Sequence, residues 1–227
     1  MFIYRYPAIG CFLVFILMMF FTACNQKQKD QPTENVASIE TTVIEEPKDT
    51  VIIDACMTLE EALTGTKAPE SILNELVLLN VEYKSTDNKL HRGQIIVNKK
   101  IEDETRHMFQ FMLDNDFTIE KVIPIVAYDW SDSLSMDDNN SSGFNYRNIS
   151  YSKHATGMAI DINPRFNPLR WKNSNRPNQP AGAALDTTIN GTLHPNHDVV
   201  KEFRKLGFRW GHTFSKYYDD HHFEMNR

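Results

Sequence analysis

The chain has 227 residues, a formal net charge of −6 and a hydrophobic content of 41%. That apolar share is sufficient for a packed core. The acidic balance and the lack of a long basic block argue against a nucleic-acid partner, which needs a positively charged footprint.

The first 24 residues, MFIYRYPAIGCFLVFILMMFFTAC, predict an export signal. Arg5 provides a short basic region, an apolar run follows, and the small residues Thr22 and Ala23 precede Cys24. The ending FTAC resembles a bacterial lipobox, which implies a signal peptide over 1–23 and a lipid on Cys24. The alternative is a plain transmembrane anchor, because the apolar run approaches spanning length. We expect the mature chain to lie in the cell envelope, lipid-anchored and facing the periplasm or the outside.

Cysteine usage limits the chemistry of any metal site. Cys11 would leave with the signal and Cys24 would carry lipid, so Cys56 would have no disulfide partner. A bound metal must therefore be held by His, Asp or Glu. Residues 24–50 are polar, contain Pro and show no apolar period, which predicts a flexible tether. Residues 51–227 have the size of a single ordinary domain.

The remaining chain mixes helix and strand signals without regular βα alternation. Thr58 and Glu61 form a capping box, Pro69 opens a second helix, and Gly207 ends the last one. The predicted helices begin at 58 and 69 and cover 101–116 and 198–207; the predicted strands are 76–84, 94–98, 122–128, 159–162 and 222–225, with a polar loop over 129–152. This pattern predicts an α+β fold with a small, mostly antiparallel sheet flanked by helices.

The stretch HATGMAID, residues 154–161, places a histidine and an aspartate in an apolar context. In a strand, Asp161 shares a face with the small Ala159, while Ile160 and Ile162 point to the opposite face and into the core. A glycine between the histidine and the strand permits a bend that returns His154 to the same side. Taken alone, the segment fits either an ion pair or part of a metal site.

The C-terminal stretch YYDDHHFEMNR supplies the missing groups. His222 and Glu224 share one strand face, and Asp219 lies three residues earlier, at the turn into that strand. His154, Asp161 and His222 would form a two-histidine, one-carboxylate set, which suits one Zn²⁺ with a fourth position open to water. A carboxylate beside that water can accept its proton, and Asp219 is placed for this role.

These residues resemble a known family. Ser152, His154, Gly157, Ala159 and Asp161, followed by D-x-x-H-F-E over 219–224, are similar to the zinc peptidases of the D-alanyl-D-alanine carboxypeptidase family. The likeness is to its VanY-like branch and to the L-Ala-D-Glu endopeptidases of phage endolysins. It extends over roughly residues 70–227, including the segments around 135–147 and 206–211.

The resemblance implies a role for each matching residue. His154, Asp161 and His222 match the zinc ligands and Asp219 matches the catalytic acid/base. Arg147 and Ser152 match positions near the substrate, where a guanidinium suits a carboxylate or an oxyanion. A surface arginine and a turn-capping serine are their alternatives. Glu224 is expected either to hold a ligand histidine or to form an ordinary strand salt bridge.

Two departures from the family pattern concern the cleft. Relatives often have Gly-Gly-Asp-Trp where this chain has residues 211–214, and Pro where it has His221. The doublets Asp219-Asp220 and His221-His222 also leave a question of register, because a shift by one residue exchanges the faces of a strand. Asp220 and His221 are the fallback pair. The remaining histidines are expected on the surface or in loops, with His212 the one that could border the cleft.

The expected function is therefore a zinc peptidase that hydrolyses an amide bond in peptidoglycan stem peptides, either L-Ala-D-Glu or D-Ala-D-Ala. The expected fold is that of the D-Ala-D-Ala peptidases and the related Hedgehog signalling domains. Those domains also provide the alternative, a non-catalytic zinc-containing lipoprotein that binds peptidoglycan. A metal-dependent nuclease, which the run DDHH permits, conflicts with the acidic charge. We expect a monomer that meets the membrane only through its N-terminal lipid.

Overall fold

The computed structural model describes residues 50–149 and 151–226. The predicted signal peptide, Cys24 and all of the predicted tether except residue 50 lie outside these residues. The helices are α1 (Leu59–Ala62), α2 (Glu70–Leu73), α3 (Glu102–Asp114), α4 (Asp132–Asp137) and α5 (Asp198–Lys205). The strands are β1 (Ile52–Ile53), β2 (Leu76–Lys84), β3 (Leu90–Asn98), β4 (Lys121–Val122), β5 (Asn140–Ser141), β6 (Ala159–Asp161), β7 (Leu169–Trp171), β8 (Arg209–Trp210), β9 (Tyr217–Asp219) and β10 (His222–Glu224).

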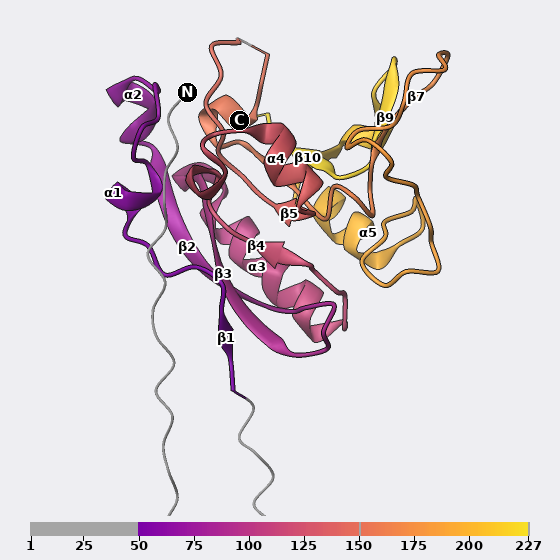
Figure 1. Ribbon diagram of the computed structural model, residues 1–227, viewed down its shortest axis with the longest axis horizontal. Coiled ribbons are helices and arrows are strands. Elements are labelled where there is room, and N and C mark those ends of the chain that lie inside the picture. The colour runs from indigo at the N-terminus through magenta and orange to yellow at the C-terminus, as the bar shows by residue number, and fades with distance from the viewer. Residues whose placement is uncertain (1–49, 150, 227) are drawn as a thin grey trace, which may run out of the picture. The chain divides into compact units, whose positions relative to one another are not determined.

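A long hairpin and one helix form the first part of the fold. Strands β2 and β3 pair antiparallel along their whole length, and β1 adds in parallel to the other edge of β3. Helix α3 packs on this hairpin (Figure 1). Its buried residues Thr105, Met108, Phe109 and Met112 recur at helical spacing, as the sequence predicts.

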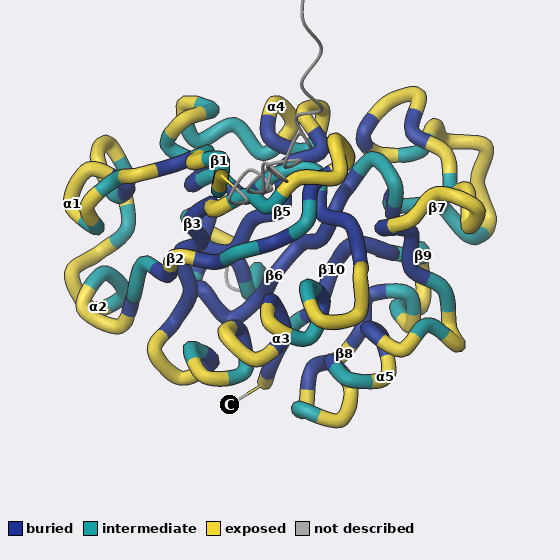
Figure 2. The backbone as a smooth tube through the Cα atoms, turned by 90° about the horizontal axis from the view of Figure 1, so that it is seen from below, coloured by how far each residue is buried: buried dark blue, intermediate teal, exposed yellow. Residues whose placement is uncertain are grey.

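The second part contains a three-stranded sheet in the order β6-β10-β8, with both pairings antiparallel. Ile160 and Phe223 leave its inner face and join one core cluster with residues of the hairpin and of α3 and α5. Figure 2 shows β3, β6 and β10 as buried backbone running through the centre. The small sheet is thus held by the core on one side, which leaves its other side free for polar groups.

The end of α5 confirms a local prediction. Gly207 has a φ of +98°, its N–H bonds the carbonyl of Arg204, and the Phe208 N–H bonds the carbonyl of Phe203. This is the Schellman arrangement. The rings of Phe203 and Phe208 complete it with an edge-to-face contact, with their centroids 5.2 Å apart. The capping box at Thr58 and Glu61 is also present.

The prediction of a strand over 122–128 is wrong. The strand ends at Val122, and Ile125–Tyr128 forms a 3₁₀ helix after Pro124. Proline has no N–H for a strand ladder and fixes φ near the helical value, so the apolar run turns instead of extending. The loop expected over 129–152 likewise contains α4, whose first turn is capped by the Ser131 hydroxyl.

Helices and small sheets are mixed, which confirms the α+β class at that level. Instead of one small sheet, residues 50–149 and 151–226 contain two three-stranded and two two-stranded sheets. Antiparallel pairs dominate, but β1 with β3 and β4 with β5 are parallel. Across the same residues, no helix combines the length and the apolar character that crossing a bilayer requires.

Candidate metal centre

Two neighbouring strands bring a histidine and an aspartate face to face. In the antiparallel pair β6 and β10, His222 lies directly opposite Asp161, and Phe223 lies opposite Ile160. Because side chains alternate along a strand, the core takes Ile160 and Phe223, and the opposite face receives Asp161 and His222. The pairing predicted from the two sequence segments is therefore present.

His154 reaches the same face from a 3₁₀ turn, His154–Thr156, that ends at Gly157. Gly157 has a φ of +69°, and its carbonyl accepts a hydrogen bond of 2.8 Å from the Asn98 N–H. A Cβ at this position would lie 2.7 Å from that same nitrogen. Only glycine allows both the left-handed turn and the close approach of β3, so the bend expected at Gly157 has a steric cause.

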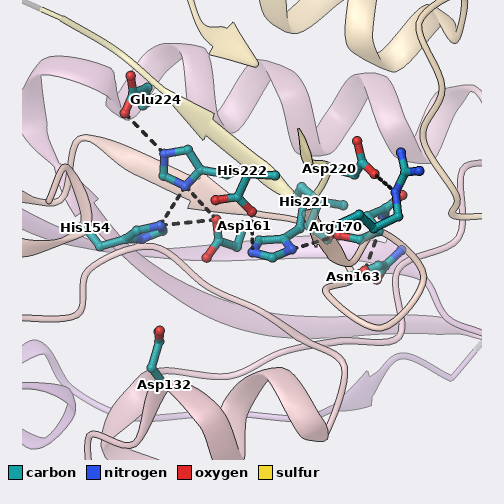
Figure 3. A network of polar contacts seen from close by, with 12 residues as sticks. Asp132, His154, Asp161, Asn163, Arg170, Asp220, His221, His222 and Glu224 are labelled. Atoms are coloured by element: carbon teal, nitrogen blue, oxygen red, sulfur yellow. Dashed lines mark hydrogen bonds and ion pairs between the residues drawn. The ribbon is translucent and has the colours of Figure 1, made fainter. Parts of the chain in front are cut away.

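The three side chains converge on one point (Figure 3). His222 Nδ1 is 2.9 Å from Asp161 Oδ1, His154 Nε2 is 3.2 Å from the same oxygen, and the two ring nitrogens are 3.0 Å apart. One ligand atom from each residue lies within 4.8 Å of the others, and all three residues are buried. The group has the size and the donor chemistry to hold a metal ion, and two imidazoles with one carboxylate suit zinc.

Hydrogen bonds on the far side of each ring orient the two histidines. Nδ1 of His154 donates to the Gly143 carbonyl at 2.6 Å, which directs the lone pair of Nε2 toward the group. Nε2 of His222 lies 3.3 Å from Glu224 Oε2, which leaves Nδ1 as the ligand atom. Glu224 also lies 3.5 Å from Arg209, so both expectations for it, holding a ligand histidine and forming a salt bridge, describe real contacts.

Asp219 lies at the end of β9 beside this group. Its side chain is 14% exposed, and its Oδ1 is 3.0 Å from Nε2 of His221. This buried oxygen nevertheless has no well-aligned hydrogen bond. A buried carboxylate oxygen without a full hydrogen bond is unusual and calls for an explanation, such as a catalytic role of its carboxylate or a nearby ion.

The structure also resolves the question of register. Asp220 turns away from the metal group and binds Arg170 Nε at 2.8 Å and His212 Nδ1 at 2.6 Å. His221 contacts Asp219 but is not among the three converging side chains. The fallback pair Asp220 and His221 is therefore excluded as a source of ligands to this group.

A cleft of about 270 Å³ opens over the metal group. Arg147 and Ser152 both line it, as expected for residues near a substrate. The structure adds Asp132, at the start of α4, whose Oδ1 lies 3.0 Å from Arg147 Nη2 and fixes the guanidinium on the cleft wall. The sequence analysis does not identify Asp132, because it predicts a loop over 129–152. The pair Ser131-Asp132, a helix cap followed by an acid in the first turn, is the sequence feature that indicates a helix start here.

The other histidines do not take part. Among the described residues, the cleft is lined by His154, His221 and His222 and by no further histidine. His91 lies between Asp54 and Asp87, His107 pairs with Glu202, and His212 stacks on Trp210. His194 and His197 contact each other edge to face.

Charges inside the group shift its pKa values in opposite directions. Burial lowers the pKa of His222, but contacts with Asp161 and Glu224 outweigh it and raise that pKa to about 10. Burial likewise lowers the pKa of His221, but Asp219 and Asp161 raise it to about 9. Burial raises the pKa of Asp161, yet the charges of His154 and His221 hold it well below its ordinary value. The carboxylates thus demand positive charge, which a metal ion would provide in place of protons.

One of three comparisons with known proteins matches the segment that carries this site. Curated proteins and solved structures gave no match to the chain. Residues 147–225 match a family model described as D-alanyl-D-alanine carboxypeptidase. This stretch includes the three converging residues together with Arg147 and Asp219. The match confirms the resemblance that the sequence motifs suggested: residues 147–225 are similar to the D-alanyl-D-alanine carboxypeptidase family of peptidases.

Proposed function

We propose that this protein is a zinc metallopeptidase that hydrolyses an amide bond in peptidoglycan stem peptides. The observation that carries the proposal is the convergence of His154, Asp161 and His222 beside the largely buried carboxylate of Asp219. The family match over 147–225 supports a peptidase acting on peptidoglycan-like substrates. The predicted lipid on Cys24 and the tether over 24–50 form part of the proposal, since they would keep the enzyme near the cell wall.

Each residue has a task in this chemistry. His154 Nε2, His222 Nδ1 and a carboxylate oxygen of Asp161 would hold Zn²⁺, which supplies Lewis acidity and lowers the pKa of a bound water. Asp219 accepts the proton of the attacking water and returns it to the leaving amine. Arg147, fixed by Asp132, binds a substrate carboxylate or the developing oxyanion.

Two further clefts share lining residues with the central one, which favours an internal peptide bond. Arg147 also lines a second cleft of about 610 Å³ that includes Lys67 and Trp130. A third cleft of about 280 Å³ shares Tyr151, Phe214, Tyr217 and Glu224 with the central one. A carboxypeptidase needs a closed end at the terminal residue, whereas these clefts leave room for more of the peptide chain beyond the central cleft. We therefore favour the L-Ala-D-Glu endopeptidase over the D-Ala-D-Ala carboxypeptidase.

The test is mass spectrometry of the products from purified muropeptides incubated with the zinc-loaded protein. New termini at one amide bond are expected, and their masses identify the bond. Asp219→Ala should keep its zinc and lose turnover by about 10²- to 10⁴-fold, the usual contribution of a general acid/base. Asp161→Ala should lose zinc itself, because it removes one of three ligands.

Three results would contradict the proposal or part of it. Equal loss of zinc from the Asp161 and Asp219 variants would show that the ligand assignment is wrong. Release of D-Ala alone would exclude the endopeptidase in favour of the carboxypeptidase. Binding of peptidoglycan without any new termini would favour the non-catalytic binding protein.

A further inference from the structure

We infer that His221 is a positioning residue that holds the carboxylate of Asp219 in place for proton transfer; this rests on the proposed function. The ring bridges two fixed points, with Nε2 at 3.0 Å from Asp219 Oδ1 and Nδ1 at 2.7 Å from the carbonyl oxygen of Asn167. His221 is only 4% exposed, yet it lines the cleft together with Asp219.

The support behind the ring is rigid. Asn167 is fully buried, and its amide nitrogen donates to the carbonyls of Ile162 and Gly191, while its Oδ1 accepts from the Leu193 N–H at 2.6 Å. The carbonyl of His221 in turn accepts a hydrogen bond of 3.0 Å from the Ile162 N–H. Ring and backbone are therefore both anchored, which is the condition for holding a neighbouring group within a fraction of an ångström.

The hydrogen-bond direction fixes the orientation of the ring. A carbonyl oxygen only accepts, so Nδ1 of His221 donates to Asn167 and Nε2 must face Asp219. The contact with Oδ1 is short but is not a well-aligned hydrogen bond, so the ring restrains the carboxylate by close contact from a fixed position. Oδ1 is buried against the ring, which leaves Oδ2 as the oxygen that accepts the proton.

Comparison with Asp220 shows that the contact between His221 and Asp219 lies on the cleft side of the turn. Asp220 points to the opposite side, toward Arg170 and His212, and does not line the cleft. Figure 3 shows the two directions, with Asp220 beside Arg170 and His221 between that pair and the metal group. A histidine required only for packing would have no need to meet the one carboxylate proposed as the base.

The experiment compares kcat, KM and zinc content of the zinc-loaded protein with those of its variants. We expect His221→Phe to lower kcat by about 10- to 100-fold, as for other residues that orient a reacting group, with KM and zinc content changed by less than about twofold. His221→Gln, whose amide can still donate toward Asp219, should recover part of the loss. The control is His91→Gln, which removes a similar contact with Asp54 far from the cleft and should leave kcat unchanged.

A double-variant cycle separates positioning from a general structural role. In the Asp219→Asn background, His221→Phe should lower kcat by less than about twofold, because the group that it positions has already been removed. Effects that multiply independently, or a zinc content that falls with kcat, would overturn the inference.

A measurement without substrate tests the contact itself. In ¹⁵N spectra of the histidine rings of the zinc-loaded protein, the His221 signals should move on Asp219→Asn and stay in place on Asp132→Asn. Unmoved His221 signals would overturn the inference even if the enzyme is active. A wild-type protein that shows the contact but cleaves no amide would instead refute the proposed function, and with it the role of His221 in turnover.

Discussion

At the scale of single residues, the group of His154, Asp161 and His222 with Asp219 and His221 joins carboxylates to histidines that can compensate their charge. Asp161 is buried and Asp219 is largely buried. Asp161 contacts His154 and His222, and Asp219 contacts His221, so each of these histidines is within contact distance of a carboxylate. Burying a carboxylate requires a nearby positive charge, and here either protonated imidazoles or a cation can supply it. A metal ion would therefore compete with protons for this group of side chains.

This competition predicts how the stability of the metal-free protein changes with pH. The pKa of His222 is raised from 6.5 to about 10 and that of His221 to about 9. The stability from their protonation is fully present below 6.5 and is lost as pH rises through the raised values. Urea unfolding with a chelator present should therefore give a falling free energy of unfolding between about pH 6.5 and about pH 10.

Zinc should change the sign of this dependence. Zinc binds the neutral form of histidine, so the zinc-loaded protein should gain stability over the metal-free protein as pH rises through the same interval. A free energy of unfolding that rises with pH in the metal-free protein would contradict the assignment of the raised pKa values. At the acid end, the lowered pKa of Asp161 predicts a second loss of stability as pH falls below its ordinary value of 3.8.

At the scale of elements, the centre depends on where short segments end. Strands β6 and β10 have three residues each, and their pairing sets Asp161 against His222. The turn at Gly157 adds His154, and its fit against Asn98 joins the turn to β3. Such short segments have little stability of their own and are held by the core beneath them.

The turn at Gly157 gives a second prediction. Gly157→Ala should destabilise the protein by about 2–4 kcal/mol, because it adds a steric clash to the roughly 1 kcal/mol cost of a left-handed alanine. It should also weaken zinc binding, since the added Cβ would lie 2.7 Å from Asn98 N and 2.8 Å from Leu76 Cδ2 and push His154 out of place.

Gly207→Ala is the matched control. Gly207 is also left-handed, with φ at +98°, but a Cβ there would meet nothing within 4 Å. In urea unfolding, Gly207→Ala should lower the free energy of unfolding by the conformational cost alone, and Gly157→Ala should lower it further. In zinc titration, only Gly157→Ala should bind zinc more weakly. Equal losses and unchanged zinc affinity would show that the contact with β3 is unimportant.

At the scale of the whole described structure, one core connects the hairpin with the sheet of the metal centre. The cluster includes Leu79 and Ile95 of the hairpin, Met108 of α3, and Ile160 and Phe223 beneath the metal group. The family match begins only at residue 147, yet the core beneath the motif residues also contains residues that precede this segment.

The shared core predicts that the motif segment cannot fold alone. A fragment of residues 140–227 should show no cooperative unfolding by circular dichroism and should not bind one zinc ion tightly, because its apolar side would be exposed. A fragment of residues 51–227 should do both. Cooperative unfolding and tight zinc binding by the short fragment would contradict the prediction.

The sequence by itself determined the local elements and the donor set. Capping residues, periodicity and alternation placed β2, α3 and α5, and the faces of β6 and β10 followed from the period of two. These are properties of neighbours along the chain. Predictions from these patterns were wrong in two places. At Pro124 the missing N–H ended the strand that the apolar run predicted, and at Ser131 a capping hydroxyl began a helix where the polar pattern predicted a loop.

Only the tertiary structure decided what each of the two acids and two histidines of 219–222 contacts. Across the turn between β9 and β10, Asp219 and His221 line the cleft, whereas Asp220 binds Arg170 and His212. Contacts from Asn167, Arg170 and Asp132 come from distant parts of the chain, and spacing along the sequence carries no information about them. The physical reason is that a strand pattern fixes which residues share a face, while partners from other segments fix what each side chain meets there.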